Sequence, residues 1–453
     1  MPAGGGLLQL VATGKQDLFL TGNPQISFFK MVYRRHTNFA TESQSMYFDG
    51  TPNFGQRITC LVPRRGDLLG RVYLDVTLPQ IKDTSGNVLS YTNSIGHALI
   101  QEIALEVGEQ EIDKQTGEWM EVWTQFTTPA GQRNALNEMI GRVEQYLPPN
   151  LIPGTDGLKL MIPLQFYFCK NPGLYLPLLA LQYHPIRINI TLRPLQQLFW
   201  IEPPPIQEGW NPACKTSIDC TAQITNMMLW GEYVYLDVEE RRRFVSETQE
   251  YLIEQVQYTP PYSVGSQQTN AVVSVEFNHP IKEFIFVVQR DEMENRNEWF
   301  NYSNLAINQP IPSTTEPKSN CNIDSYMNSN APAGRVDLIS SAKLQLDGYD
   351  RFAERGPSYF RLQQPYEHHT TTPVNSFIYN YCFALRPEDV QPTGTMNASR
   401  IDSITWQINM NNVLSNPTLP SWKQRGPCHI VIYGHNYNVF RVINGFGGLL
   451  FTI

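Results

Sequence analysis

Charged residues are scarce in this chain. Asp, Glu, Lys and Arg make up 17% of its 453 residues, and the net charge is −8 when the histidines are neutral. Proteins that bind nucleic acid mainly through its phosphates carry a clear excess of basic side chains. The charge balance therefore argues against direct nucleic-acid binding as the main task of this chain.

The sequence also lacks a long apolar run. No stretch approaches the ~18 unbroken apolar residues that are typical of a membrane-spanning helix. No basic segment precedes the short apolar run that begins at Leu7, so we expect no secretory signal. We therefore expect the chain to fold in a cytosol.

Cysteines are few and follow no pattern. The seven lie at positions 60, 169, 214, 220, 321, 382 and 428. An odd number without close spacing is not typical of a disulfide framework or of a zinc site. We expect free thiols in a reducing compartment, and only a bridge between Cys214 and Cys220 is left open.

What the chain does contain is turn residues, aromatic residues and alternating segments. It has 33 Pro, 30 Gly, 22 Tyr and 22 Phe, a mixture that suits short strands joined by many turns. Polar and apolar residues alternate in segments 71–78, 102–107, 185–194, 271–277 and 404–408. This period of two is typical of antiparallel sheets with one buried face, so the sequence predicts an all-β protein.

Helical periodicity is rare. Segment 132–149 carries an apolar stripe of Leu136, Ile140, Val143 and Leu147, and two prolines end it. A shorter helical turn is predicted over 237–244, where Asp237 is a suitable N-cap.

Three pairs of segments indicate that the chain contains a duplication. In chain order, they are 105–123 with 344–363, 166–172 with 381–387, and 231–237 with 433–440. The first pair runs from an alternating strand through a glycine turn to an aromatic residue, and the second reads as an aromatic strand that ends in proline. Any two β-sandwiches look broadly alike, but three pairs in the same order favour a duplicated domain of about 200 residues. The charged stretch 239–250 is the predicted boundary.

Familiar catalytic arrangements are weak or missing. Acidic residues gather at positions 106, 109, 111, 113, 118 and 121, and paired carboxylates are the machinery of a glycosidase. Acidic residues on the wet face of an amphipathic strand are the more ordinary interpretation. His368 and His369 are adjacent, would point to opposite faces of a strand, and are interpreted as part of a solvated loop. We therefore predict no catalytic, cofactor-binding or metal-binding residue.

Loops carry the remaining expectations. Segment 291–335 is polar and has no period, so we expect it on the outer surface. We expect aromatic loop residues to fill contacts between subunits; the candidates are Trp119, Trp123, Phe126, Trp200, Trp210 and Trp299.

Five segments resemble the major capsid proteins of nucleocytoplasmic large DNA viruses, especially those of viruses of algae and amoebae. They are 14–39, 64–79, 233–244, 383–402 and 432–451, and together they cover nearly the whole chain. Segment 383–402, FALRPEDVQPTGTMNASRID, is similar to a Pro–Gly–Asn–Ser–Arg motif of that family. The motif residues in this sequence are Pro387, Pro392, Gly394, Asn397, Ser399 and Arg400.

The resemblance implies a tandem double jelly roll, meaning two eight-stranded antiparallel β-sandwiches with long loops and few short helices. The implied divisions are an N-terminal arm (1–26), a first jelly roll (27–238), a linker (239–249) and a second jelly roll (250–453). The motif would be a rigid turn that aims a core strand, with Asn397 and Arg400 bonding backbone groups. On that basis we expect Arg400→Ala to cost on the order of 1–3 kcal/mol of stability.

The resemblance further implies a structural protein without enzymatic activity or cofactor. Three copies would form a roughly hexagonal capsomer of an icosahedral virion shell, assembled in the host cytoplasm. The expected partners are other copies of the chain, minor capsid and penton proteins and, indirectly, an internal membrane, with no direct contact to nucleic acid. A carbohydrate-active β-sandwich protein, either a lectin or a glycosidase, is the alternative.

Overall fold

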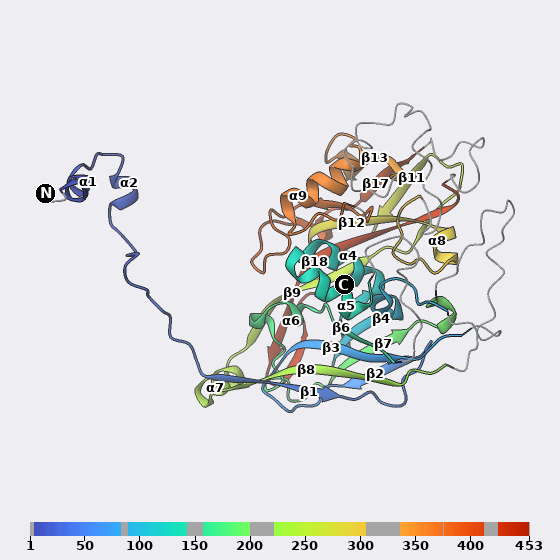
Figure 1. Cartoon of the computed structure of the whole chain (residues 1–453), viewed down its shortest axis with the longest axis horizontal. Coiled ribbons are helices and arrows are strands. Elements are labelled where there is room, and N and C mark those ends of the chain that lie inside the picture. Colours follow the sequence, from blue (N-terminus) through green and yellow to red (C-terminus); the bar gives the residue numbers. More distant parts are fainter. Residues whose placement is uncertain are drawn as a thin grey trace. The chain divides into compact units, whose positions relative to one another are not determined.

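The structure is a computed structural model that describes residues 4–82, 89–142, 157–199, 222–304, 336–374, 376–411 and 425–452. The chain separates into two compact units, Met1–Asn38 and Phe39–Ile453. The first unit contains two short helices, α1 (Gly5–Val11) and α2 (Leu18–Thr21), and extended chain (Figure 1). Within the described residues, no helix has both the length and the apolar character to cross a membrane.

The first half of the second unit forms a sandwich of two four-stranded antiparallel sheets. One sheet has the order β1 (Phe39–Met46), β8 (Asn226–Leu236), β3 (Leu68–Leu78) and β6 (Leu158–Pro163). The other has the order β2 (Arg57–Leu61), β7 (Ile186–Leu192), β4 (Ile100–Val107) and β5 (Gln110–Thr116). Apolar residues at alternate positions of these strands make one continuous core, in which Leu74, Leu105 and Ile188 have no exposed surface. The alternation in the sequence is the cause, because it places every second side chain on the inner face.

The second half forms a sandwich of one seven-stranded and one four-stranded antiparallel sheet. The larger contains β10 (Tyr262–Val264), β18 (Cys428–Ile443), β12 (Pro280–Arg290), β15 (Tyr379–Cys382), β16 (Met396–Asn397), β19 (Phe446–Leu449) and β9 (Gln249–Tyr258). The smaller has the order β11 (Asn270–Val275), β17 (Ile404–Met410), β13 (Ile339–Leu346) and β14 (Tyr349–Asp350). The larger sheet gains strands because β18 is 16 residues long: its first part pairs with β10 and β12, and its later part with β9 and β19.

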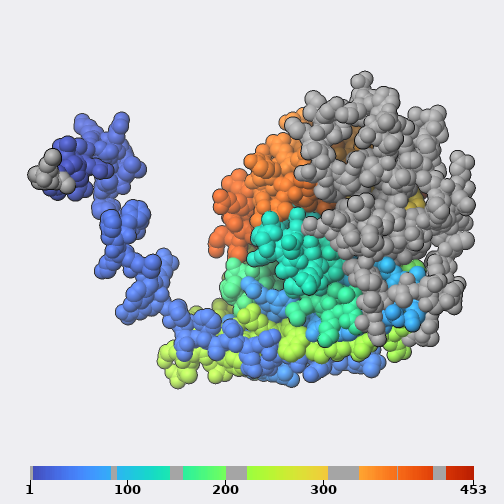
Figure 2. Space-filling model, viewed as in Figure 1, coloured from blue at the N-terminus to red at the C-terminus, as the bar shows by residue number. Residues whose placement is uncertain are grey.

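The seven-stranded sheet is buried on both faces. Phe284 and Phe286 of β12 point into the core of the second sandwich. Ile285 and Val287 point the other way, into a separate apolar cluster with Trp119 of helix α4 (Gly117–Thr127). Helix α4 of the first half therefore packs against the second sandwich, as the adjoining teal and orange surfaces in Figure 2 also show.

The remaining elements of the described residues are short helices and helical turns. They are α3 (Ile95–Leu99), α5 (Ala130–Ile140), α6 (Tyr167–Lys170), α7 (Val238–Ser246), α8 (Asp291–Asn295), α9 (Gln364–His368), the 3₁₀ turns η1 (Pro172–Leu174), η2 (Leu195–Gln197) and η5 (Ala398–Arg400), and the π-helical turn η4 (Tyr359–Gln363). Helix α7 is confirmed, with the Asp237 carboxylate accepting a hydrogen bond from the Val238 N–H.

Two predictions of local structure need correction. Helix α5 ends at Ile140 because Gly141 takes a left-handed conformation, with φ of 67°, and so caps the helix. The rest of the predicted stripe, from Val143 onward, lies outside the described residues. Segment 166–172 was predicted as an aromatic strand but contains helix α6, whose Tyr167 and Phe168 are buried.

The first of the repeated segment pairs has the same build in both halves. The hairpin β4–β5 turns at Gly108, and helix α4 with buried Trp119 follows. The hairpin β13–β14 turns at Gly348, and the helical turn η4 with buried Phe360 follows. Both glycines have positive φ, a conformation that costs glycine little.

The prediction of an outer loop over 291–335 is wrong for residues 296–304, nearly all of which are buried, whereas Glu294 and Asn295 are exposed. The Asn297 side chain donates to the carbonyl groups of Gln196 (2.9 Å) and Phe199 (2.8 Å), and the Trp299 indole donates to that of Gln197 (2.8 Å). These polar side chains are buried because they satisfy backbone groups of the first sandwich. Residues 305–335 lie outside the described part of the chain.

The loop aromatics were also misplaced as intersubunit contacts. Trp119, Trp123 and Phe126 belong to the apolar cluster around α4, and Trp299 packs on the first core. They join parts of one chain, so they are not available to a second copy. Trp200 and Trp210 lie outside the described residues.

Candidate functional site

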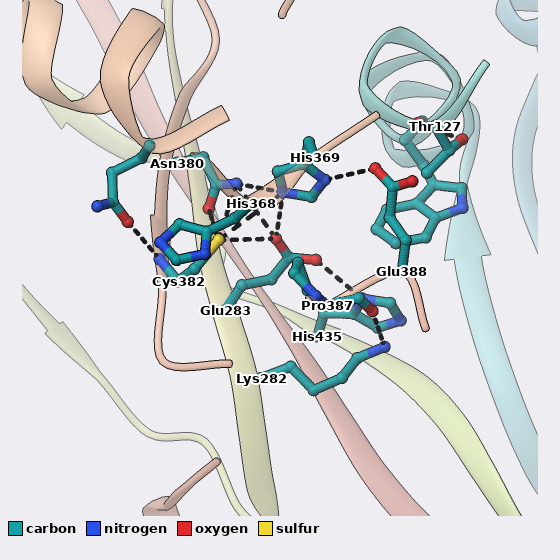
Figure 3. Close-up of polar contacts among 12 residues, drawn as sticks. Thr127, Lys282, Glu283, His368, His369, Asn380, Cys382, Pro387, Glu388 and His435 are labelled. Carbon is teal, nitrogen blue, oxygen red and sulfur yellow. Dashed lines mark hydrogen bonds and ion pairs between the residues drawn. The ribbon is translucent and has the colours of Figure 1, made fainter. Parts of the chain in front are cut away.

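Ionisable and other polar side chains gather in a buried position where α4 and α6 of the first half meet the seven-stranded sheet. Figure 3 shows those around Glu283 and His369. We call this group the junction cluster; it consists of Lys170, Glu254, Lys282, Glu283, His369, Asn380, Cys382, Glu388 and His435. Lys282, Glu283 and Asn380 have no exposed surface.

Strand β12 sets the middle of the cluster. Glu283 pairs directly with Cys382 of β15 on one side and with His435 of β18 on the other. These three side chains therefore form a row on the face that looks toward α4. The register with β18 shifts between Ile281 and Glu283, and this β-bulge lets Lys282 reach the cluster as well.

His369 is the best-connected member. Its Nε2 atom lies 2.8 Å from Glu283 Oε2, and its Nδ1 atom lies 2.8 Å from Glu388 Oε1. The His369 side chain has no exposed surface, because the rings of Phe126 and Trp123 cover it. The interpretation of this histidine as part of a solvated loop is therefore wrong.

His368 behaves differently. Its side chain is 17% exposed, and its Nδ1 atom lies 2.9 Å from the carbonyl oxygen of Leu385.

Two lysines tie the halves of the chain together through one carboxylate. Lys170 of α6 donates to Glu254 Oε2 over 2.9 Å, and Lys282 of β12 donates to Glu254 Oε1 over 2.5 Å. Lys282 also donates to the carbonyl of Pro387 over 2.7 Å. A lysine from each half thus shares Glu254.

These contacts decide the charges. Burial favours the neutral form of Glu254, but Lys170 and Lys282 outweigh it and hold its pKa well below the usual range. Burial likewise opposes a charge on His369, yet Glu283 raises the pKa of this histidine well above the ordinary value. Burial lowers the pKa of His435, with nearby Lys282 adding to the effect, so that histidine is neutral near neutral pH.

The predicted motif residues extend from the cluster to the surface. Pro387 is buried and reaches Lys282 through its carbonyl, whereas Pro392 and Gly394 are exposed, Gly394 with a φ of 135°. The Asn397 side chain accepts a hydrogen bond from the Ser399 N–H over 3.1 Å, and Ser399 Oγ accepts one from the His279 N–H over 2.8 Å.

Arg400 does not form the hydrogen bonds to backbone groups that were expected from the sequence. Its side chain is exposed and forms no hydrogen bond or ion pair with any residue that the structure describes. The expected bond to neighbouring backbone groups is therefore absent from the described part of the chain, because the turn η5 leaves this side chain in solvent.

The predicted acidic group is split up by the fold. Glu121 is buried between Arg142 and His97, and Glu118 pairs with Arg193. Asp113 is buried against Gln115, whereas Glu109 is exposed. The interpretation as a wet strand face is wrong for Asp113 and Glu121. Glu106 and Glu111 lie opposite each other on β4 and β5, where Arg57 pairs with Glu106.

Comparison with known proteins identifies the family of this chain. The family described as "Major capsid protein N-terminus" matches residues 27–237, and "Large eukaryotic DNA virus major capsid protein" matches residues 240–448. The major capsid protein of Phaeocystis pouchetii virus is 36% identical to this chain, with 99% of each sequence covered. The chain belongs to the major capsid proteins of large eukaryotic DNA viruses.

Two further comparisons support the assignment. The major capsid protein of Paramecium bursaria Chlorella virus 1 is 34% identical, with 99% of each sequence covered. A solved structure titled "PBCV-1 virus capsid, quasi-atomic model" covers 94% of this chain and all of its own chain, at 30% identity and a TM-score of 0.74. The fold is therefore the double jelly roll of this family, and the protein is a structural component of the virion shell, in agreement with the prediction that it is not an enzyme.

Sequence reasoning missed the junction cluster. Its members come from positions 170 to 435 and have no common spacing. One signal was present: Lys282 and Glu283 interrupt the otherwise apolar run of β12. Adjacent charges inside a strand buried on both faces require partners, and this requirement points to a buried network.

Proposed function

We propose that three copies of the chain form one pseudo-hexagonal capsomer of an icosahedral shell. The observation that carries the proposal is that one chain contains two sandwiches of similar build, so a threefold ring presents six similar units. Closed cyclic symmetry gives a bounded assembly, whereas a non-closing contact gives filaments.

Open sheet edges support an obligate assembly. Strands β1, β6, β2 and β5 each end a four-stranded sheet of the first sandwich, and of these β5 is covered within the chain by β9 and β19. Such edges pair without control unless another element or subunit covers them. Neighbouring copies in a trimer and in a shell are the covering partners of this proposal.

The N-terminal unit supplies a further contact. Within the arm, Leu10, Phe19 and Leu20 are each more than 75% exposed. Apolar side chains exposed to this extent mark a surface that binds another protein. We propose that this arm faces the inside of the shell and is held by neighbouring capsid proteins.

The divisions at 1–26, 27–238, 239–249 and 250–453 are part of the same proposal, with the arm and the two jelly rolls acting as separate units. Minor capsid and penton proteins are the proposed partners, with an internal membrane contacted indirectly and nucleic acid not at all. Assembly is proposed to occur in the host cytoplasm. The alternative of a lectin or glycosidase is not favoured, since the family comparisons point to capsid proteins.

Sedimentation of the recombinant chain tests the trimer. At low nanomolar concentration the protein should sediment as one species of about three times the chain mass of 51.8 kDa. A folded monomer with native circular dichroism at that concentration would show that the trimer is not obligate.

A further inference from the structure

Three possible metal ligands converge at the centre of the junction cluster. Glu283, His369 and Cys382 each offer one atom, and the three atoms lie within 4.8 Å of one another. We propose that these residues bind a zinc ion that joins β12, β15 and the chain segment after α9. This site is additional to the capsid role and does not depend on the trimer.

The distances are close to those of a zinc site. With zinc–ligand bonds of about 2.0–2.3 Å, the ligand atoms of a tetrahedral site lie about 3.3–3.8 Å apart. Cys382 Sγ lies 3.7 Å from Glu283 Oε2 and 3.8 Å from His369 Nε2. Glu283 Oε2 and His369 Nε2 are 2.8 Å apart, so among these three atoms only this edge has to lengthen, by about half an ångström.

Asn380 provides a fourth ligand. Its side-chain amide group lies 2.5 Å from His369 Nε2, 3.2 Å from Glu283 Oε2 and 3.3 Å from Cys382 Sγ. The nitrogen and oxygen of an amide exchange places by a flip of the group. Such a flip turns the carbonyl oxygen of Asn380 toward the other three ligand atoms.

The contacts around His369 Nε2 favour this arrangement. Hydrogen bonding to Glu283 requires a proton on Nε2, whereas accepting from the Asn380 amide N–H requires that atom to be unprotonated. One nitrogen cannot meet both requirements, so the Asn380 amide takes the flipped orientation, with its oxygen toward Nε2. A cation in the middle satisfies the imidazole, the carboxylate and the flipped amide together.

A second shell of contacts already orients the histidine. Histidines that bind metals usually donate their other ring N–H to a carboxylate or a carbonyl group. His369 Nδ1 lies 2.8 Å from Glu388 Oε1, and the Thr370 N–H donates to the same oxygen over 3.0 Å. Glu388 therefore fixes the tautomer in which Nε2 faces the other ligands.

The exchange of protons for zinc is neutral in charge. Binding forms bonds from the ion to Cys382 Sγ and His369 Nε2, and it releases the thiol proton of one and the Nε2 proton of the other. Two positive charges leave as protons and two enter with the ion. The neighbouring ion pairs of Glu254, one with Lys170 and one with Lys282, keep their charges unchanged.

The ligand set selects the metal and its role. A thiolate with an imidazole suits zinc, whereas magnesium and calcium prefer oxygen ligands only. Four protein ligands in a buried position leave no place for a substrate, which is typical of a structural site. The ion would connect two strands and a helix end, and so stabilise the side of the second sandwich that faces α4.

Metal content of the full chain tests the site. After washing with a chelator to remove surface ions, purified protein should contain one zinc ion per chain. Protein produced in cobalt-containing medium should show the absorption bands of tetrahedral cobalt bound to a thiolate. Protein that is free of metal, and that shows no such bands, overturns the proposal.

Matched variants identify the ligand. Cys382→Ser should lose the ion and the cobalt bands, while Cys60→Ser, a change of another buried free thiol, should keep both. Retention of metal in Cys382→Ser would refute the site. If Cys382→Ser does not fold, X-ray absorption at the zinc edge of the Cys60→Ser protein decides: one sulfur ligand supports the proposal, and a shell of nitrogen and oxygen alone contradicts it.

Discussion

Two buried carboxylates of the first sandwich show how surroundings decide the charge of a residue. Burial raises the pKa of Asp113 to about 6, and its hydrogen bond from Gln115 only partly offsets the effect. Burial also disfavours a charge on Glu121, but Arg142 and His97 outweigh it and lower the pKa to about 2. Burial alone therefore disfavours the charged form of Asp113, whereas the basic neighbours of Glu121 keep that residue charged.

Asp113→Asn should change how stability depends on pH. The folded pKa of Asp113, about 6, lies above its usual value of 3.8, so folding loses stability as the pH rises from about 4 to 6. The variant has no such loss and should be more stable at pH 7, by about 3 kcal/mol at most. Urea unfolding at several pH values measures the difference. An effect of the same size at pH 4 and pH 7 would contradict the explanation.

In the motif after β15, we expect substitution of two exposed residues, Gly394 and Arg400, to affect stability by very different amounts. An alanine at Gly394, where φ is 135°, would be strained, and its Cβ would lie 3.1 Å from the carbonyl oxygen of Phe383. Gly394→Ala should therefore cost about 1–3 kcal/mol. Arg400→Ala should change the stability of the isolated chain by less than about 0.5 kcal/mol, in place of the larger loss expected from sequence. Thermal unfolding of both variants provides the measurement, and a large loss in Arg400→Ala would show an unrecognised partner.

At the scale of elements, prediction from sequence succeeded where one face of a strand meets solvent. Strands β3, β11 and β17 alternate because each has a buried and a less buried face. Strand β12 is buried along nearly its whole length, so it carries no period that marks it as a strand. Helix α4 was missed for the same reason, since most of its side chains are buried between the two sandwiches.

The junction cluster was beyond the reach of sequence reasoning. Zinc sites are recognised in a sequence by close spacing of ligands, but Glu283, His369 and Cys382 meet only through strand pairing and the end of α9. The polarity of segment 296–301 led to a wrong prediction of an exposed loop for a similar reason. Its polar groups bond buried backbone instead of water, and only the fold reveals those partners.

We expect segment 291–304 to stabilise the contact between the two sandwiches, because it follows a strand of the second sandwich and binds backbone groups of the first. Trp299 donates to the Gln197 carbonyl, and the Arg193 guanidinium lies 4.1 Å from the centre of its ring. Trp299→Ala should cost about 3–5 kcal/mol, and Trp299→Phe, which loses the N–H but keeps a ring, clearly less. Denaturant unfolding of both variants tests the order. Equal stability of Trp299→Ala and the wild type would mean that the segment does not hold the sandwiches.

At the scale of the whole molecule, the arm and the sandwiches should have separable tasks. Deleting residues 2–26 removes Phe19 and Leu20, which are 92% and 88% exposed, but no strand of either sandwich. The truncated protein should therefore form soluble trimers and assemble poorly into particles. A variant with Phe19→Ser and Leu20→Ser should share the defect if apolar contact is its cause. Normal particles from the truncated chain would contradict the assigned role of the arm.

Electron microscopy of purified capsomers tests the central claim most directly. Averaged images should show threefold symmetry with a nearly hexagonal outline, in which three chains contribute two sandwiches each. Capsomers with twofold symmetry, or particles built from single chains, would contradict the account.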